Sequence, residues 1–201
     1  MSHRVPVLAL MVGALASGTA LARPTVLDNI PLKWSPTSTL TEFGPVDLTS
    51  SDLAVKIHVE SLTDSRQNPT LVGQNTEKPD KPLTVSTSTD VAGFVTDHLK
   101  EQLKAAGLTV VDGAGDVTLS GEIRQYFVSE TSTYHGEISL VFHLKNSAGK
   151  ELWSGSVTGD AERFGRSYKA DNYFEVLADT LLKGAHNLLA NPGFHDGLEK
   201  R

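Results

Sequence analysis

The stretch TSTDVAGFVTDHLKEQLKAAGLTVVD, residues 87–112, decides the fold of this chain. Its large apolar residues recur every three or four positions, the spacing of one helix face: Val91, Phe94, Val95, Leu99, Leu103 and Ala106. Thr87 or Ser88 can cap the first turn of this helix, where Asp90 also meets the positive end of the helix dipole. Gly107 can adopt the left-handed conformation that ends the helix, and the apolar residues after it predict a buried strand.

The flanking chain supplies a sheet on which this helix can pack. Alternation of apolar and polar residues predicts strands over 53–60, 83–85, 117–127, 138–144 and 153–159. A second helix with an apolar stripe is predicted after Asn172, which forms a capping box with Glu175. The first strand and the strand after the first helix can pair in parallel through a right-handed crossover. We therefore predict an α+β two-layer sandwich, with a mixed, mostly antiparallel sheet and two helices packed on one face.

The first 22 residues have the pattern of a secretory signal peptide. Arg4 supplies a positive charge, an apolar run follows, and Ala20-Leu21-Ala22 is a cleavage motif, so we expect cleavage between Ala22 and Arg23. The alternative is a membrane anchor that is never cleaved, although the apolar run is shorter than the about 20 residues that span a bilayer. Cleavage would leave an exported protein without a transmembrane span, periplasmic or secreted, in a Gram-negative bacterium.

The remaining chain divides into three parts. Residues 23–50 are rich in Pro and Thr and predict an extended arm with little regular structure. Residues 51–192 form a single α+β domain, in which 61–82 read as a long polar loop. Residues 193–201 are expected to be a polar tail.

The composition excludes several functional classes. A formal net charge of −6 over 201 residues disfavours a basic patch for nucleic acid or for anionic lipid. The chain has no cysteine, which excludes disulfides, thiolate catalysis and a lipid-modified cysteine. No phosphate loop, nucleophile elbow or dinucleotide fingerprint is present, so we expect neither a cofactor nor a catalytic site.

One face of the predicted sheet is left open to solvent and carries most of the candidate interaction residues. They lie at positions of opposite parity to the apolar ones: Glu122, Arg124, Tyr126, Glu137 and His143. The face is either a polar binding surface or a solvated surface without a partner. His135 and Glu137 are two apart on one strand and could chelate zinc with a third ligand, but no H-E-x-x-H motif supports a metal site.

Asp64 and Arg66 complete the candidate set. They follow the first strand at its carboxyl end, where loops of α/β sheets often bind ligands. The alternative is a local Asp–Arg pair that orders the loop.

The pattern resembles the YajG-type lipoproteins of Gram-negative envelopes. The similar features lie in five places: 55-VKIHV-59, 64-DSR-66, 72-VG-73, 99-LKEQLKAAGLTVV-111 and 153-WSG-155. The order of elements is also similar to that of the TolB amino-terminal domain and of lipoproteins that activate peptidoglycan synthases. This resemblance implies a non-enzymatic envelope protein working through protein contacts. The chain departs from the pattern because Arg23, not a lipidated cysteine, follows the cleavage motif.

Three functions are therefore open. The first is an interaction module of the envelope, with a protein partner on the open face or on residues 61–82. The second is a binder of a small polar ligand such as a glycan or peptidoglycan fragment. Five aromatic residues could stack on its sugar rings: Trp34, Tyr126, Trp153, Tyr168 and Tyr173. The third is a hydrolase using His143 or Glu137.

Overall fold

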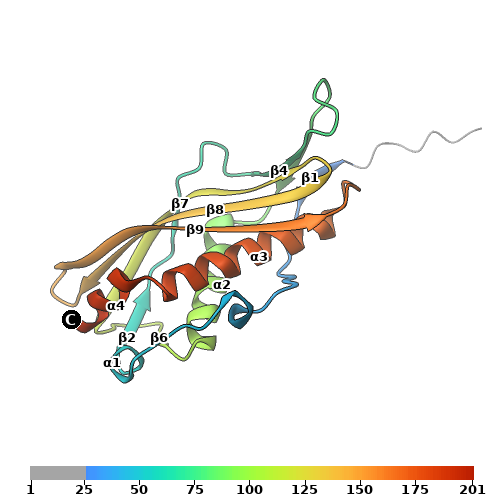
Figure 1. Ribbon diagram of the computed structural model, residues 1–201. Helices are drawn as coiled ribbons and strands as arrows, with labels where there is room; N and C mark the ends of the chain where they lie inside the picture. Colours follow the sequence, from blue (N-terminus) through green and yellow to red (C-terminus); the bar gives the residue numbers. More distant parts are fainter. Residues whose placement is uncertain (1–25) are drawn as a thin grey trace, which may run out of the picture.

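The computed structural model describes residues 26–201, so the expected cleavage position between Ala22 and Arg23 lies outside the described residues. These residues form one open sheet of nine strands, with the helices packed on one face (Figure 1). The predicted two-layer α+β sandwich is therefore confirmed. No helix in residues 26–201 is both long enough and apolar enough to cross a membrane.

The strands are β1 Leu27–Ile30, β2 Lys56–Val59, β3 Thr63–Asp64, β4 Leu71–Asn75, β5 Leu83–Thr87, β6 Thr109–Val111, β7 Val117–Glu130, β8 Thr133–Asn146 and β9 Glu151–Phe164. The helices are η1 Leu40–Phe43, which is a 3₁₀ helix, α1 Ser50–Leu53, α2 Val91–Ala105, α3 Ala170–Leu189 and α4 Pro192–Glu199.

β7 is the strand on which the sheet is organised. On one side it pairs antiparallel with β8 along its length, and β8 pairs antiparallel with β9, so β7, β8 and β9 form a meander, in agreement with the predicted mostly antiparallel sheet. On its other side β7 pairs in parallel with three short strands in turn, β2, β3 and β4. β2 pairs in parallel with β6, as predicted, whereas β4 pairs antiparallel with β5, and β5 pairs in parallel with β1. The sheet therefore splits into two branches at opposite ends of β7.

The helix predicted in 87–112 is α2, and its apolar face is buried as expected. The predicted cap is wrong, because Thr87 still belongs to β5. Asp90 caps the helix instead, and its carboxylate accepts a hydrogen bond from the Ala92 N–H at 3.1 Å. Gly107 ends the helix with a φ of 101°, as predicted. α2 lies against α3, so both long helices cover the same face of the sheet (Figure 1).

Three predictions between the arm and β7 need correction. The first strand begins only at Lys56, since the preceding residues form α1. Residues 61–82 are not one loop, because β3 and β4 lie within them and pair with β7. β6 is an edge strand with an exposed Thr109 and half-buried valines, and is not buried as expected.

Two predictions at the carboxyl end are also wrong. α3 begins at Ala170 without a side-chain cap, and Asn172 is buried, donating to the hydroxyls of Tyr134 and Ser167 at 3.0 and 2.7 Å. The expected polar tail is α4, which buries Phe194 and Leu198. The apolar contacts of these two side chains explain why this segment folds as a helix on the domain.

Candidate binding groove between the arm and the helices

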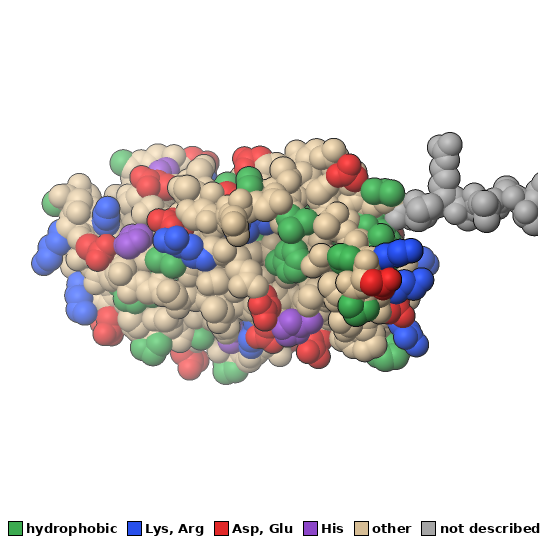
Figure 2. Space-filling view, turned by 90° about the horizontal axis from the view of Figure 1, so that it is seen from above, with side chains coloured by type: hydrophobic (Ala, Val, Ile, Leu, Met, Phe, Trp, Pro, Cys, Tyr) green, Lys and Arg blue, Asp and Glu red, His purple; other side chains and the backbone are tan. Residues whose placement is uncertain are grey.

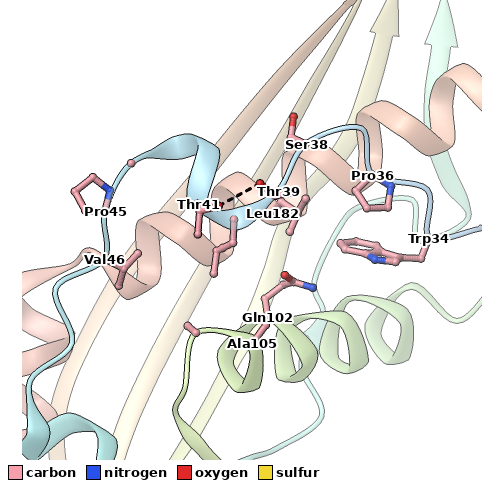
Figure 3. Close-up of a pocket in the computed structure, with 13 residues that line it drawn as sticks. Trp34, Pro36, Ser38, Thr39, Thr41, Pro45, Val46, Gln102, Ala105 and Leu182 are labelled. Carbon is pink, nitrogen blue, oxygen red and sulfur yellow. Dashed lines mark hydrogen bonds between the residues drawn. The ribbon is translucent and has the colours of Figure 1, made fainter.

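The arm is only partly irregular, since it contributes β1 to the sheet and contains η1. Residues 34–46 of the arm run across α2 and α3, and a groove of about 790 Å³ lies between this segment and the two helices (Figure 3). That volume lies within the range of small-molecule sites in proteins. The groove is lined by Trp34, Pro36, Ser38, Thr39, Leu40, Thr41, Gly44, Pro45 and Val46 of the arm, Gln102, Ala105 and Ala106 at the end of α2, and Leu182 of α3.

The lining is neutral and mostly apolar. None of the lining residues carries a charge, and the polar side-chain groups are three hydroxyls, one amide and the indole N–H of Trp34. The oxygens of Thr39 and Thr41 lie 3.3 Å apart and are hydrogen-bonded to each other, while the Gln102 amide points into the groove (Figure 3). Because an unpaired charge is costly to bury, this lining favours a neutral, apolar group as the occupant.

Asp179 of α3 holds the arm in place. Its carboxylate accepts hydrogen bonds from the N–H groups of Thr37 and Ser38 at 2.8 and 3.0 Å, and one from the Thr37 hydroxyl. The Trp34 ring stacks on His98 of α2, with ring centroids 4.2 Å apart and planes inclined by 13°. The arm is therefore attached to both helices, and the groove between them is a defined feature of the fold.

Sequence reasoning misses this groove because contacts between an irregular arm and a helix leave no periodic pattern. The apolar stripe of the second helix does not include Asp179, so the burial of this carboxylate against the arm leaves no signal in the sequence pattern either.

Asp64 and Arg66 are close together, as predicted, and form a pair that orders the loop. The guanidinium of Arg66 donates to both oxygens of Asp64 at 2.8 and 2.7 Å and to the carbonyls of Pro69, Leu71 and Tyr126. All of its N–H groups are thus engaged within the chain. Burial raises the pKa of the Asp64 carboxyl, but the hydrogen bonds and charge of Arg66 lower it further, so the pKa lies below its ordinary value. The arrangement supports the structural alternative over ligand contact.

Four of the five predicted open-face residues are where the sequence placed them. Arg124 pairs with Glu122 at 2.6 Å, and His143 pairs with Glu151 at 2.9 Å. Glu137 lies 3.2 Å from His135, which contacts Glu162 at the same distance. These pairs are exposed and separate from one another, as on a solvated sheet face. The described residues contain no group of three or more His, Asp or Glu side chains that could hold a metal ion.

Tyr126 is the exception, and its predicted place on the open face is wrong. A bulge in β7 between Ile123 and Gln125 shifts the register by one residue, so that the strand beyond it presents the opposite set of side chains to the core. Tyr126 is fully buried and donates its hydroxyl to the carbonyl of Leu177 at 3.1 Å. Burial raises the pKa of this phenol. Phe127 takes the outward position instead.

Comparisons with known proteins identify the fold. No protein-family model matches the chain, and no curated protein matches it in sequence. A Xanthomonas campestris protein of the DUF330 family is similar in structure, with a TM-score of 0.53, 12% identity, and coverage of 83% of this chain and 93% of that one. A second, uncharacterised protein gives a TM-score of 0.51 at 11% identity, covering 82% and 97%. A minor lipoprotein from Acinetobacter baumannii covers 68% and 93% at 12% identity, but its TM-score of 0.36 is too low to support an argument. The chain therefore has the fold of the DUF330 protein from Xanthomonas campestris.

Proposed function

We propose that this protein is an exported accessory protein of a bacterial cell envelope, that it acts by binding and not by catalysis, and that the groove between the arm and the helices holds an apolar ligand. The signal-peptide pattern of residues 1–22 supports export. The neutral, mostly apolar lining of the groove is the observation that carries the binding site. An unbranched alkyl chain matches this lining, since it needs no charged partner.

A polar glycan is less well supported as the ligand. Four of the five aromatic residues expected to stack on sugars make contacts within the protein: Tyr126 and Tyr173 are buried, Trp153 packs on Phe194 with ring centroids 5.7 Å apart, and the Tyr168 hydroxyl donates to the carbonyl of Thr84 at 2.7 Å. Trp34 is the one of the five that lines the groove, and one face of its ring is already occupied by His98. A protein partner on the open face stays a prediction, which the double variant Glu122→Ala, Arg124→Ala would test in a crosslinking pull-down.

Trp34 provides a direct test of the groove. The chain has two tryptophans, so in a Trp153→Phe background the fluorescence reports on Trp34 alone. We expect a neutral alkyl ester that carries bromine atoms on its chain to quench this fluorescence in a saturable manner, because bromine quenches tryptophan on contact.

Substitutions at the end of α2 provide the matched control. Ala105→Phe should fill the groove and abolish saturable quenching, whereas Lys104→Phe adds the same ring to the neighbouring exposed position outside the lining and should leave it unchanged. Equal quenching in the two variants, or none in the parent, would refute the groove as a ligand site. Recovery of the protein in the periplasmic fraction after osmotic shock tests export separately.

A further inference from the structure

Three of the four most exposed large apolar side chains in residues 26–201 lie at one end of the molecule. They are Val26, Leu83 and Phe164, which are 68%, 41% and 89% exposed. The fourth is Leu53 of α1, 40% exposed, at the other branch of the sheet. Single exposed apolar residues are normal on a protein surface, whereas a group of them indicates a surface that binds another protein or a membrane.

The sheet topology places these side chains at the same end of the molecule. Val26 precedes β1, whose Leu27 aligns with Val85 of β5, and Leu83 is the first residue of β5. Phe164 is the last residue of β9, and Arg166 just beyond it reaches Glu77 in the turn before β5 at 3.2 Å. The turn between β4 and β5 and the connection from β9 to α3 therefore meet at this end, which we call the β1 end (Figure 1).

Basic side chains surround the apolar ones at the β1 end. Lys78 and Lys81 lie in the turn between β4 and β5, and Arg166 and Lys169 lie in the connection to α3. Four acidic side chains are also present: Asp28 of β1, Glu77, Asp80 and Asp171, of which Glu77 is paired with Arg166. The β1 end thus carries four basic and four acidic groups, a higher proportion of basic groups than in the whole chain, which has 18 Lys and Arg against 24 Asp and Glu. Figure 2 shows Lys and Arg side chains gathered beside apolar ones at this end.

We propose that the β1 end docks on the surface of an anionic lipid bilayer, with Phe164, Leu83 and Val26 entering the headgroup region and Lys78 and Lys81 meeting lipid phosphates. Mixed apolar and basic side chains are the composition that binds such interfaces. The place where the expected signal peptide joins the described part of the chain, just before Val26, supports a bilayer as the partner of this surface. A precursor still held in the membrane would present this end to the bilayer. The proposal is independent of the groove, which the β1 end does not line.

Vesicle flotation tests this docking. The chain beginning at Arg23, which contains every described residue, is mixed with vesicles of phosphatidylethanolamine and phosphatidylglycerol at low salt. We expect it to float with them, and to float less as phosphatidylglycerol is replaced by phosphatidylcholine or as salt is raised. Phe164→Ser and the double variant Lys78→Glu, Lys81→Glu should each reduce partitioning about tenfold, since an inserted aromatic ring and a lysine near an anionic surface each contribute on this scale.

Matched controls lie away from the β1 end. Leu53→Ser removes the fourth exposed apolar side chain, and Lys145→Glu, Lys150→Glu reverses two charges near the turn between β8 and β9. Both should leave partitioning unchanged. No flotation with any vesicle composition would overturn the proposal, as would losses of equal size in the controls. All of the substituted side chains are exposed, so circular dichroism and melting temperature should match those of the parent.

Discussion

Glu130 accepts a hydrogen bond from the hydroxyl of Tyr173 at 2.7 Å, and both residues are fully buried. The other carboxylate oxygen accepts the backbone N–H groups of Ser167 and Tyr168, both at 2.9 Å. Tyr168 has a φ of 43°, which large side chains rarely adopt. The buried carboxylate of Glu130 therefore joins the end of β7 to α3 and holds the connection between β9 and α3 in an otherwise unfavourable conformation.

Glu130→Gln should lower the free energy of unfolding by about 3 kcal/mol. The substitution removes a charged acceptor from three donors, and the new amide NH₂ faces either the Tyr173 hydroxyl or the two backbone N–H groups, which are donors themselves. Urea unfolding followed by circular dichroism measures the change. Glu137→Gln makes the same substitution on the open face of β8 and should cost less than about 0.5 kcal/mol. Similar losses in the two variants would show that the carboxylate has no special role.

Stability should fall in acid, and Glu130 should contribute to the fall. Burial raises the pKa of the Glu130 carboxyl, but the hydrogen bonds from Tyr173 and Tyr168 lower it further, so the folded-state pKa lies below its ordinary value. A carboxyl with a lowered folded-state pKa contributes stability above its unfolded-state pKa of about 4.3, and loses it as the pH falls through the folded value. Asp52 and Asp64 also have lowered pKa values and act in the same direction.

Urea unfolding between about pH 6 and pH 3 checks this dependence. The free energy of unfolding should decline below about pH 4.5, and the decline should be shallower in Glu130→Gln, which has lost one titrating group. A parallel decline in the variant would mean that Glu130 does not titrate with unfolding in this range.

Arg66→Lys should destabilise the protein by about 2 kcal/mol, although it keeps the positive charge. The planar guanidinium donates to one carboxylate and three carbonyls at once, and an ammonium group cannot reproduce that geometry. Arg124→Lys is the matched control, because Arg124 is exposed and pairs only with Glu122. The difference in melting temperature between the two variants is the measurement, and equal melting temperatures would contradict the role given to Arg66.

Elements with a repeating burial pattern are predictable from the sequence of this protein. α2 and the meander of β7, β8 and β9 each present the same face to the core over many residues, so their apolar positions recur at fixed spacing. Tyr126 lies on the face opposite to the predicted one because one extra residue in β7 inverts the alternation. The adjacent polar pair Arg124-Gln125 is the local sign of that bulge, since both side chains are exposed.

The groove could not be predicted in the same way. Its walls come from an arm and two helices that are distant in sequence, and its position depends on where the arm is attached. β1 and α4 escape sequence reasoning for a related reason. Each is short, and its conformation follows from contacts with the finished domain more than from its own propensity.

Asp179→Ala should release the arm without unfolding the domain. The substitution removes all three hydrogen bonds from Thr37 and Ser38 to the carboxylate, and arms held by few contacts open locally before the core does. Lys33 is exposed and lies in this part of the arm, so trypsin reports on the opening. We expect cleavage after Lys33 to become at least about tenfold faster, since each hydrogen bond to a charged group contributes about 1.5–3 kcal/mol. Asp171→Ala, an exposed position on the same helix, should leave the rate unchanged.

In the Trp153→Phe background, Asp179→Ala should also weaken quenching by the brominated alkyl ester, because the released arm no longer forms the wall of the groove. Unchanged cleavage together with unchanged quenching would mean that the arm is held by the Trp34–His98 stack and β1 without help from Asp179.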